Sequence, residues 1–238
     1  MADTMAAASR PRLVVTTDIS TLTADRGEPD DTQSMVRLML HSCDLEIEGL
    51  IASSNMRKGR LVHDDYIRAI VGAYREVREH LAVHRSDYPT AEHLLARVAP
   101  GNGEYGVAHV GAGHDTPGSD LIIAAVDLPD PRPVWVAVWG GTTDLAQALW
   151  RVSEDRSPQE LSAFIARLRV YAIGDQDDTG PWIRERFPGL LYITCRHVFR
   201  GMYKDGDQSL VTRDWVSRYV TEGHGPLGAA YPNYDGGD

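Results

Sequence analysis

The chain has 238 residues, 42% of them hydrophobic and 24% charged, which is the composition of a folded domain with a substantial core and excludes a disordered protein. Its formal net charge of -10 at pH 7 and its lack of a long Lys/Arg block exclude a protein that binds the nucleic-acid backbone. The two cysteines are too few for a disulfide framework, and no apolar run approaches the length of a membrane span.

The first predicted elements are a buried strand and a helix, separated by a polar loop. Residues 13–17 form an apolar, β-branched run, which is typical of a buried strand, and Asp18 follows it. After the loop, a proline and two acids lead into an apolar segment that reaches Leu40, a pattern typical of a helix start. We therefore expect Asp18, Asp30 and Asp31 to meet at the carboxyl end of a strand, where open α/β sheets bind ligands.

Carboxylates that meet at one point need a partner that offsets their repulsion. A cation, a proton or the hydroxyl groups of a sugar can supply it. Asp18, Asp30 and Asp31 could instead be a solvated loop with helix-capping acids, which is the usual role of a single such residue. Because all of them follow one strand, we favour a site for a hard metal ion or a polyol.

A second strand and a glycine-rich loop come next. Residues 45–52 carry the apolar pattern of a strand, and Asn55 follows them either as another polar group of the site or as a turn residue. Apolar residues recur at helical spacing over residues 64–84, and residues 91–98 predict another short helix. The segment 100–119 is rich in glycine but lacks the phosphate-binding motifs, so we expect a mobile lid.

The most convincing central strand lies in the middle of the chain. Residues 133–139 are apolar almost throughout, as expected for a parallel strand buried on both faces. Helices are predicted on either side of it, over residues 119–126 and 145–150. Residues 140–144, Gly-Gly-Thr-Thr-Asp, end this strand, so polar groups again follow a strand and glycines allow close approach of the backbone.

The rest of the chain continues the alternation of strands and helices. A capping box at residues 157–160 starts one helix, and a strand at residues 168–173 ends in a polar cluster that contains Asp175 and Asp178. These two acids are candidates for substrate binding, with a helix-capping loop as the alternative. The remaining predictions are a helix at residues 182–187, a strand at 190–194, a helix at 215–220 and a loop-like tail at 223–238.

Repetition of strand, loop and helix predicts the fold class. We expect an α/β fold with a Rossmann-like open, mainly parallel sheet and helices on both faces. No internal repeat or linker divides the sequence, so residues 12–238 are predicted to form one domain, with residues 1–11 as a disordered tail. A parallel sheet gathers its strand ends along one edge, where residues far apart in sequence can share a site.

Several blocks of the sequence resemble those of a known family: VVTTDI with EPDD, GLIASSN, VWVAVWGGTTDLAQAL, VYAIGDQDDTGPWIRERFP and HGPLGAAYP. From Arg12 to Pro232 the chain resembles the nucleoside-hydrolase-like domains associated with bacterial cellulose-binding proteins. It is similar, more distantly, to inosine-uridine nucleoside hydrolases, which open with the motif DxDxGxDD and hold one calcium ion. The resemblance implies a nucleoside-hydrolase-like fold in a chain that lacks the family's C-terminal segment.

The resemblance also implies roles for individual residues. Asp18 and Asp31 would be calcium ligands, and Asp18 would also deprotonate the metal-bound water. Thr143 stands where the enzymes have the threonine of GPLTNLA, so its backbone carbonyl would be another ligand. Asp30 and Asn55 would hold the ribose hydroxyls.

The sequence departs from the pattern of the enzymes at several points. Thr16 stands where they have their first aspartate, and a loop insertion lengthens the spacing between Asp18 and Asp30. The enzymes also supply a late aspartate to the metal, for which Asp235 or Asp238 is the candidate here. Their purine-stacking residues have no clear match. We therefore expect an incomplete site that binds calcium weakly.

The leading hypothesis is a calcium-dependent hydrolase of N-glycosidic, nucleoside-type bonds or related glycosidic bonds, with Asp18 as the catalytic base. Asp175 or Asp178 would help to bind the sugar. The alternatives are a carbohydrate-binding nucleoside-hydrolase-like domain without turnover, which would use tryptophans as sugar platforms, and a truncated domain that binds little.

The expected partner is a small molecule, a nucleoside or a sugar, and neither nucleic acid nor a membrane. A homo-oligomer is the other association that we consider. The N-terminus lacks the apolar core of a signal peptide. We expect a cytoplasmic protein, or a secreted one if an export segment has been removed.

Overall fold

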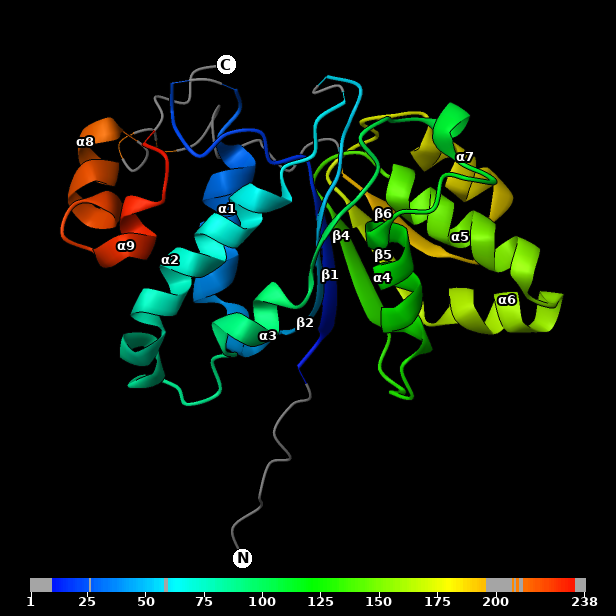
Figure 1. Ribbon diagram of the computed structural model, residues 1–238, viewed down its shortest axis with the longest axis horizontal. Helices are drawn as coiled ribbons and strands as arrows, with labels where there is room; N and C mark the ends of the chain where they lie inside the picture. Colours follow the sequence, from blue (N-terminus) through cyan, green and yellow to red (C-terminus); the bar gives the residue numbers. More distant parts are fainter. Residues whose placement is uncertain are drawn as a thin grey trace, which may run out of the picture.

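A parallel β-sheet forms the centre of the molecule (Figure 1). The computed structural model describes residues 10–25, 27–57, 60–195, 207, 209 and 212–233. Within these ranges the sheet has six strands in the order β3-β2-β1-β4-β5-β6, and every neighbouring pair is parallel. The predicted Rossmann-like α/β fold is therefore confirmed. The strands are β1 (Arg12–Thr17), β2 (Glu46–Ala52), β3 (Val98–Pro100), β4 (Val134–Val138), β5 (Leu168–Ala172) and β6 (Leu191–Thr194).

Helices lie on both sides of the sheet, and each side has its own hydrophobic core (Figure 1). Side chains alternate along a strand, so Val14 of β1 packs into one core and its neighbour Val15 into the other. The Val15 core also takes apolar residues from α1 (Asp30–Leu40), α2 (Asp64–Ala82), α3 (Ala91–Leu95) and α9 (Gly225–Ala229). The Val14 core takes them from α4 (Pro117–Asp127), α5 (Thr143–Asp155), α6 (Pro158–Ala166) and α7 (Thr179–Arg186).

The remaining helical elements of the described residues are short. They are η1 (Ser42–Asp44), η2 (Val107–His109) and α8 (Arg213–Val216), which continues into the π-helical turn η4 (Ser217–Thr221). Across the described ranges, no helix is both long enough and apolar enough to pass through a membrane.

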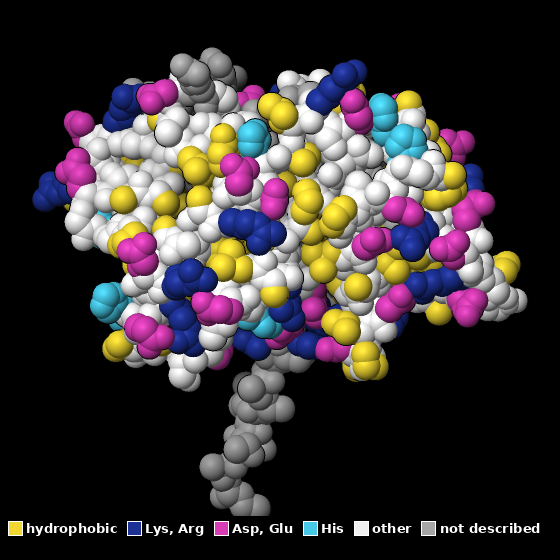
Figure 2. Space-filling model, in the orientation of Figure 1, with side chains coloured by type: hydrophobic (Ala, Val, Ile, Leu, Met, Phe, Trp, Pro, Cys, Tyr) yellow, Lys and Arg dark blue, Asp and Glu magenta, His cyan; other side chains and the backbone are white. Residues whose placement is uncertain are grey.

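Charged side chains on the visible surface alternate in sign. Figure 2 shows acidic and basic side chains next to one another over much of one face. Ion pairs also link neighbouring helices: Arg151 of α5 lies 2.5 Å from Asp120 of α4, and Arg156 lies 2.6 Å from Asp127. Pairs of this kind are half-exposed, so each contributes little to stability.

The strand order reverses between β1 and β4. From β1 the chain adds β2 and then β3 on one side, and it returns to place β4 on the other side of β1. The register pairs Thr16 with Val138, so the carboxyl ends of both strands lie at the same edge. A reversal of this kind leaves a crevice at the carboxyl ends of the two strands, which is where open α/β sheets bind ligands.

Two predictions of local structure were wrong. Residues 91–98 were expected to be helical throughout, but α3 ends at Leu95 and Val98 begins the edge strand β3, which pairs with Leu50. A strand of three residues is too short to show a periodic pattern of its own. The tail was expected to be a loop, but residues 225–229 form α9, where Leu227 is buried in the Val15 core and tertiary packing overrides the weak helix propensity of Gly and Pro.

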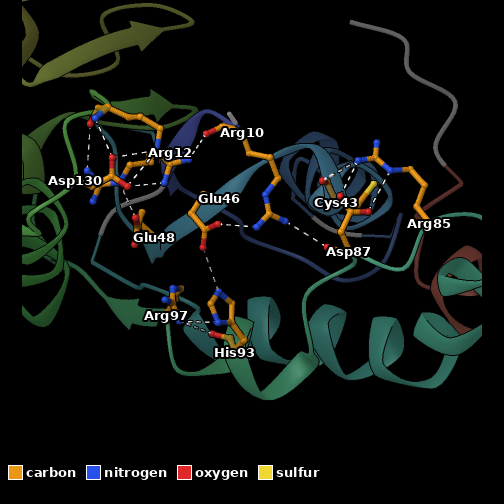
Figure 3. A network of polar contacts seen from close by, with 11 residues as sticks. Arg10, Arg12, Cys43, Glu46, Glu48, Arg85, Asp87, His93, Arg97 and Asp130 are labelled. Atoms are coloured by element: carbon orange, nitrogen blue, oxygen red, sulfur yellow. Dashed lines mark hydrogen bonds and ion pairs between the residues drawn. The ribbon is translucent and has the colours of Figure 1, made fainter. Parts of the chain in front are cut away.

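Ion pairs close the opposite, amino edge of the sheet (Figure 3). Arg12 is fully buried, and its Nε donates to Glu48 Oε1 at 2.7 Å. Its two terminal nitrogens donate to the carbonyl oxygens of Arg132, at 3.2 Å, and Ala125, at 2.5 Å. Each nitrogen of this guanidinium is therefore bonded inside the fold, and the network ties β1 to β2 and to the segment that precedes β4.

Candidate functional site

Residues from four strand ends meet at the carboxyl edge of the sheet. Asp18 follows β1, Asn55 follows β2, Gly140 follows β4 and Gln176 follows β5. A parallel sheet is predicted to gather its strand-end residues at this edge, and the structure brings Asp18 and Asn55 into direct contact there. We call Asp18, Asp30, Asp31, Asn55 and Thr143 the carboxylate site.

Asn55 holds the side chain of Asp18. Its Nδ2 donates to Asp18 Oδ2 and also to Gln176 Oε1, at 2.8 Å. Its Oδ1 accepts the backbone N–H of Arg57 at 2.7 Å. Asn55 is 1% exposed and Asp18 is 8% exposed, so this contact is shielded from solvent. The amide of Asn55, which was predicted to hold ribose, is engaged with Asp18 and Gln176.

Asp31 lies beside Asp18 at the start of α1. It is buried, and its Oδ2 accepts a hydrogen bond from the Thr17 hydroxyl. Burial, and then the negative charges of Asp18 and Asp30, raise the pKa of Asp31 well above its usual value. Asp30 is less buried, and it accepts the backbone N–H of Asp31 at 3.0 Å. A cation placed here would offset the repulsion between Asp31 and its two acidic neighbours.

Two glycines after β4 allow the backbone to approach the carboxylates. A Cβ at Gly140 would lie 2.8 Å from Asp18 Oδ1, and a Cβ at Gly141 would lie 2.5 Å from the carbonyl oxygen of Ser54. Both distances are too short for any side chain. Gly140 and Gly141 are thus required sterically, because only glycine lets the loop after β4 lie against the ends of β1 and β2.

Thr143 is fixed at the first position of α5 by its side chain. It is 2% exposed, donates to Asp177 Oδ2 at 2.9 Å and accepts the backbone N–H of Gly106 at 2.9 Å. Asp177 also accepts from both the hydroxyl and the N–H of Thr142. These bonds lock the loop after β4 to the loop after β5.

Asp175 and Asp178, the predicted sugar-binding acids of the cluster after β5, have partners elsewhere. Asp175 forms a two-point ion pair with Arg184 of α7, at 2.8 and 2.9 Å. Asp178 Oδ1 accepts the N–H of Val107 at 2.8 Å. The structure thus shows Asp175 bound within its own strand–helix unit and Asp178 bound to the glycine-rich loop.

The glycine-rich loop over residues 101–116 is fastened to the start of α5. Asp144 Oδ1 accepts from the N–H of Asn102 at 2.9 Å and from the hydroxyl of Thr116 at 2.7 Å. Further along α5, the side-chain amide of Gln147 bonds both the N–H and the C=O of Gly111, at 2.7 and 3.0 Å. The predicted lid is thus hydrogen-bonded at both ends and in its middle.

Comparison with known proteins identifies the family. Residues 12–237 match the family described as "Cellulose-binding Sde182, nucleoside hydrolase-like domain". The chain belongs to this family. Among curated proteins, no significant match is found.

Solved structures place the nucleoside hydrolase-like domain among related folds. It is similar, at 38% identity and a TM-score of 0.82 over 94% of its length, to a nucleoside hydrolase-related hypothetical protein from Saccharophagus degradans that is associated with carbohydrate metabolism. The match covers 51% of that protein, so our chain spans about half its length. An inosine-uridine preferring nucleoside hydrolase from Bacillus anthracis matches at 15% identity, over 93% of this chain and 75% of its own, with a TM-score of 0.48.

The donor atoms of the nucleoside hydrolase-like domain fit a calcium ion in part. Asp18 and Asp31 offer carboxylate oxygens, which calcium prefers, and calcium takes about six to eight oxygen ligands. Within the described ranges, no three His, Cys, Asp or Glu side chains form a group that could hold a metal ion. The candidates for the late aspartate, Asp235 and Asp238, lie outside the described residues. Backbone carbonyls and water would have to complete the shell.

Several residues that shape the site were not singled out from the sequence. They are Thr17, Gln176, Asp177 and Asp144, each of which bonds a member of the carboxylate site or the loop beside it. In the run Asp175–Asp178 the two middle residues face the site, and the two outer ones bond elsewhere. The sequence shows only that these four polar residues follow a strand. Their position does not tell which of the four side chains face the site.

Asp144 should make the stability of the calcium-free protein depend on pH. Burial raises its pKa from 3.8 to about 6, and its Oδ2 has no hydrogen-bond partner among the described residues. The folded state therefore holds this proton more tightly than the unfolded state. The free energy of unfolding should fall as pH rises from about 4 to about 6, by on the order of 3 kcal/mol from this group, and then level off.

Urea denaturation across this pH range checks the prediction, with Asp144→Asn as the comparison. Asparagine keeps the oxygen that accepts from Asn102 and Thr116 but carries no titrating proton. Subtracting the two curves isolates Asp144 from Asp31, whose pKa is also raised. Parallel curves for the two proteins would show that Asp144 does not titrate in this range.

Proposed function

We propose that the carboxylate site hydrolyses the N-glycosidic bond of a nucleoside, or a related glycosidic bond, with the help of a calcium ion. The observation that supports this most directly is the buried pair Asp18 and Asp31 at the strand-order reversal, with the pKa of Asp31 raised by burial and by its acidic neighbours. Membership of a nucleoside hydrolase-like family supports the same reaction class.

Calcium would be held by the carboxylates of Asp18 and Asp31 and by the backbone carbonyl of Thr143. The ion would supply positive charge that lowers the pKa of a water molecule in the site. Asp18 would accept a proton from that water as general base, in an orientation set by Asn55. Asp30, the least buried of the three acids, would bind sugar hydroxyls and hold the anomeric carbon for attack as positive charge develops on the sugar.

Calcium titration of the melting temperature tests the proposal. A ligand that binds only the folded state stabilises it, so calcium at about 100 times its dissociation constant should add about 2.7 kcal/mol, which raises the Tm of a chain of this size by on the order of 5–10 °C. Asp31→Asn should remove most of the rise, because an amide has lost the ligand's negative charge.

Asp120→Asn is the matched control, since Asp120 is an exposed acid on α4 that is paired with Arg151. It should respond to calcium as the wild type does, and magnesium at the same ionic strength should have a smaller effect than calcium. If Asp31→Asn gains as much Tm as the wild type, the ion does not bind at the carboxylate site. If calorimetry detects no binding at millimolar calcium, the metal-dependent reaction is refuted.

A carbohydrate-binding domain without turnover is the second candidate, and the description of the family as cellulose-binding favours it. All five tryptophans are half-buried, and Trp139 and Trp182 pack against the two cores. Trp135, Trp150 and Trp215 are therefore the better candidates for sugar platforms. A rise in Tm with ribose or cello-oligosaccharides, without release of free sugar from any glycoside, would favour this function over hydrolysis.

A further inference from the structure

Gln176 links the loop after β5 to the carboxylate site through its side-chain amide. Its Oε1 accepts from Asn55 Nδ2 at 2.8 Å, and its Nε2 donates to the backbone carbonyl of Trp139. Its own backbone carbonyl accepts the N–H of Met56 at 3.2 Å. The residue is thus held at the ends of three strands, β2, β4 and β5.

Backbone groups at both ends of this chain of bonds determine which way each amide faces. The carbonyl of Trp139 can only accept, so the Gln176 NH2 must face it and the Gln176 oxygen must face Asn55. The N–H of Arg57 can only donate, so the Asn55 oxygen must face Arg57. Both constraints agree, and they leave the Asn55 NH2 as the group that meets Asp18.

We propose that Gln176 is a positioning residue for Asp18, because it fixes the amide of Asn55 and Asn55 in turn holds the Asp18 carboxylate. Gln176 touches neither substrate nor metal in this role. The role given to Asp18 rests on the proposed function, whereas the orientation of Asn55 can be measured without it. A glutamine is required, since the position needs one donor and one acceptor at fixed ends.

Two substitutions remove this polarity at nearly constant size. Gln176→Met deletes both the donor and the acceptor, and Gln176→Glu places a second acceptor against the Trp139 carbonyl. Gln147→Met is the matched control: Gln147 is another side-chain amide, which bonds both backbone groups of Gly111 and the carboxylate of Asp115, and its side chain has no bond to the carboxylate site.

Side-chain amide NMR of the calcium-free, ¹⁵N-labelled protein gives the first measurement. The Asn55 NH2 signals, assigned by their loss in Asn55→Asp, should shift and exchange faster with water in both Gln176 variants. They should stay in place in Gln147→Met. If the Asn55 signals in Gln176→Met match the wild type, Gln176 does not position Asn55 and the proposal is overturned.

The second measurement is the calcium affinity, determined by calorimetry with the metal alone. Groups that orient a metal ligand are typically worth about 10- to 100-fold in affinity, so both Gln176 variants should lose at least about tenfold and Gln147→Met much less.

In an Asn55→Ala background, Gln176→Met should cause no further loss of calcium affinity, because its effect passes through Asn55. An additive loss would overturn the proposal. A wild type that binds no calcium would refute the metal site, and the NMR result would still decide the role of Gln176.

Discussion

Replacing Arg12 with methionine should destabilise the fold by about 3–5 kcal/mol, the cost of leaving one member of a buried ion pair without its partner. Methionine is apolar, so Glu48, whose side chain is 8% exposed, would keep its desolvation penalty and lose the guanidinium 2.7 Å away. The carbonyl oxygens of Ala125 and Arg132 would lose a donor as well. Urea denaturation at pH 7 measures the change, with the slope of the transition checked for constancy.

Two further variants test the cause of the destabilisation expected for Arg12→Met. Arg156→Met removes a two-point ion pair with Asp127 whose side chains are 28% and 44% exposed, so it should cost at most about 1 kcal/mol. Adding Glu48→Leu to Arg12→Met removes the stranded charge and should recover much of the loss. If the double variant stays as unstable as the single one, lost packing and lost bonds to the carbonyls explain the effect, and the unpaired carboxylate does not.

Replacing Asp18 with alanine should slow hydrolysis by at least about 10²-fold, the lower end of what general-base catalysis contributes. The loss should appear in kcat, because the base acts on the attacking water and binds no part of the substrate. Release of free ribose from inosine and from uridine, at saturating calcium, measures the rate. Calcium affinity has to be measured on the same variant, since Asp18 is also a proposed ligand.

Asp30→Ala offers a contrast on the neighbouring acid. Its proposed contact is with the sugar, so it should raise KM and lower kcat/KM more than kcat. Asp120→Ala, on the surface of α4, should leave both constants unchanged. An Asp18→Ala variant with wild-type turnover at saturating calcium would remove Asp18 from the mechanism.

Most of the fold could be predicted because the strands of a parallel sheet are marked in the sequence. The strand at residues 133–139 is apolar almost throughout and the helix at 64–84 is strongly periodic, and both are present within a residue or two. β3 and α9 were not predicted because they have three and five residues, too few for a hydrophobic period to appear. Their structure depends on partners far away in sequence: Leu50 for Val98 of β3, and the Val15 core for Leu227 of α9.

The site was predictable to the level of strand ends but not of side-chain directions. Asp18 and Asn55 were placed correctly at one edge because any residue directly after a parallel strand must lie there. The roles within Asp175–Asp178 depend on how one turn is twisted. That twist is set by the bonds of Asp177 to Thr142 and Thr143, more than thirty positions earlier in the chain. No local pattern carries that information.

The strand order also dictates when the site can come into existence as the chain is made. β1 can pair with β2 as soon as residues 12–52 have emerged from the ribosome, but its other edge waits for Val134, which pairs with Arg12. Until then a nascent chain carries Asp18, Asp31 and Asn55 without Gly140 or Gln176 beside them. Pairing across so long a separation is slow, because the entropy of closing the loop must be overcome first. Assembly of the site is therefore a late event in folding, and the edge of β1 needs protection from wrong pairing in the interval.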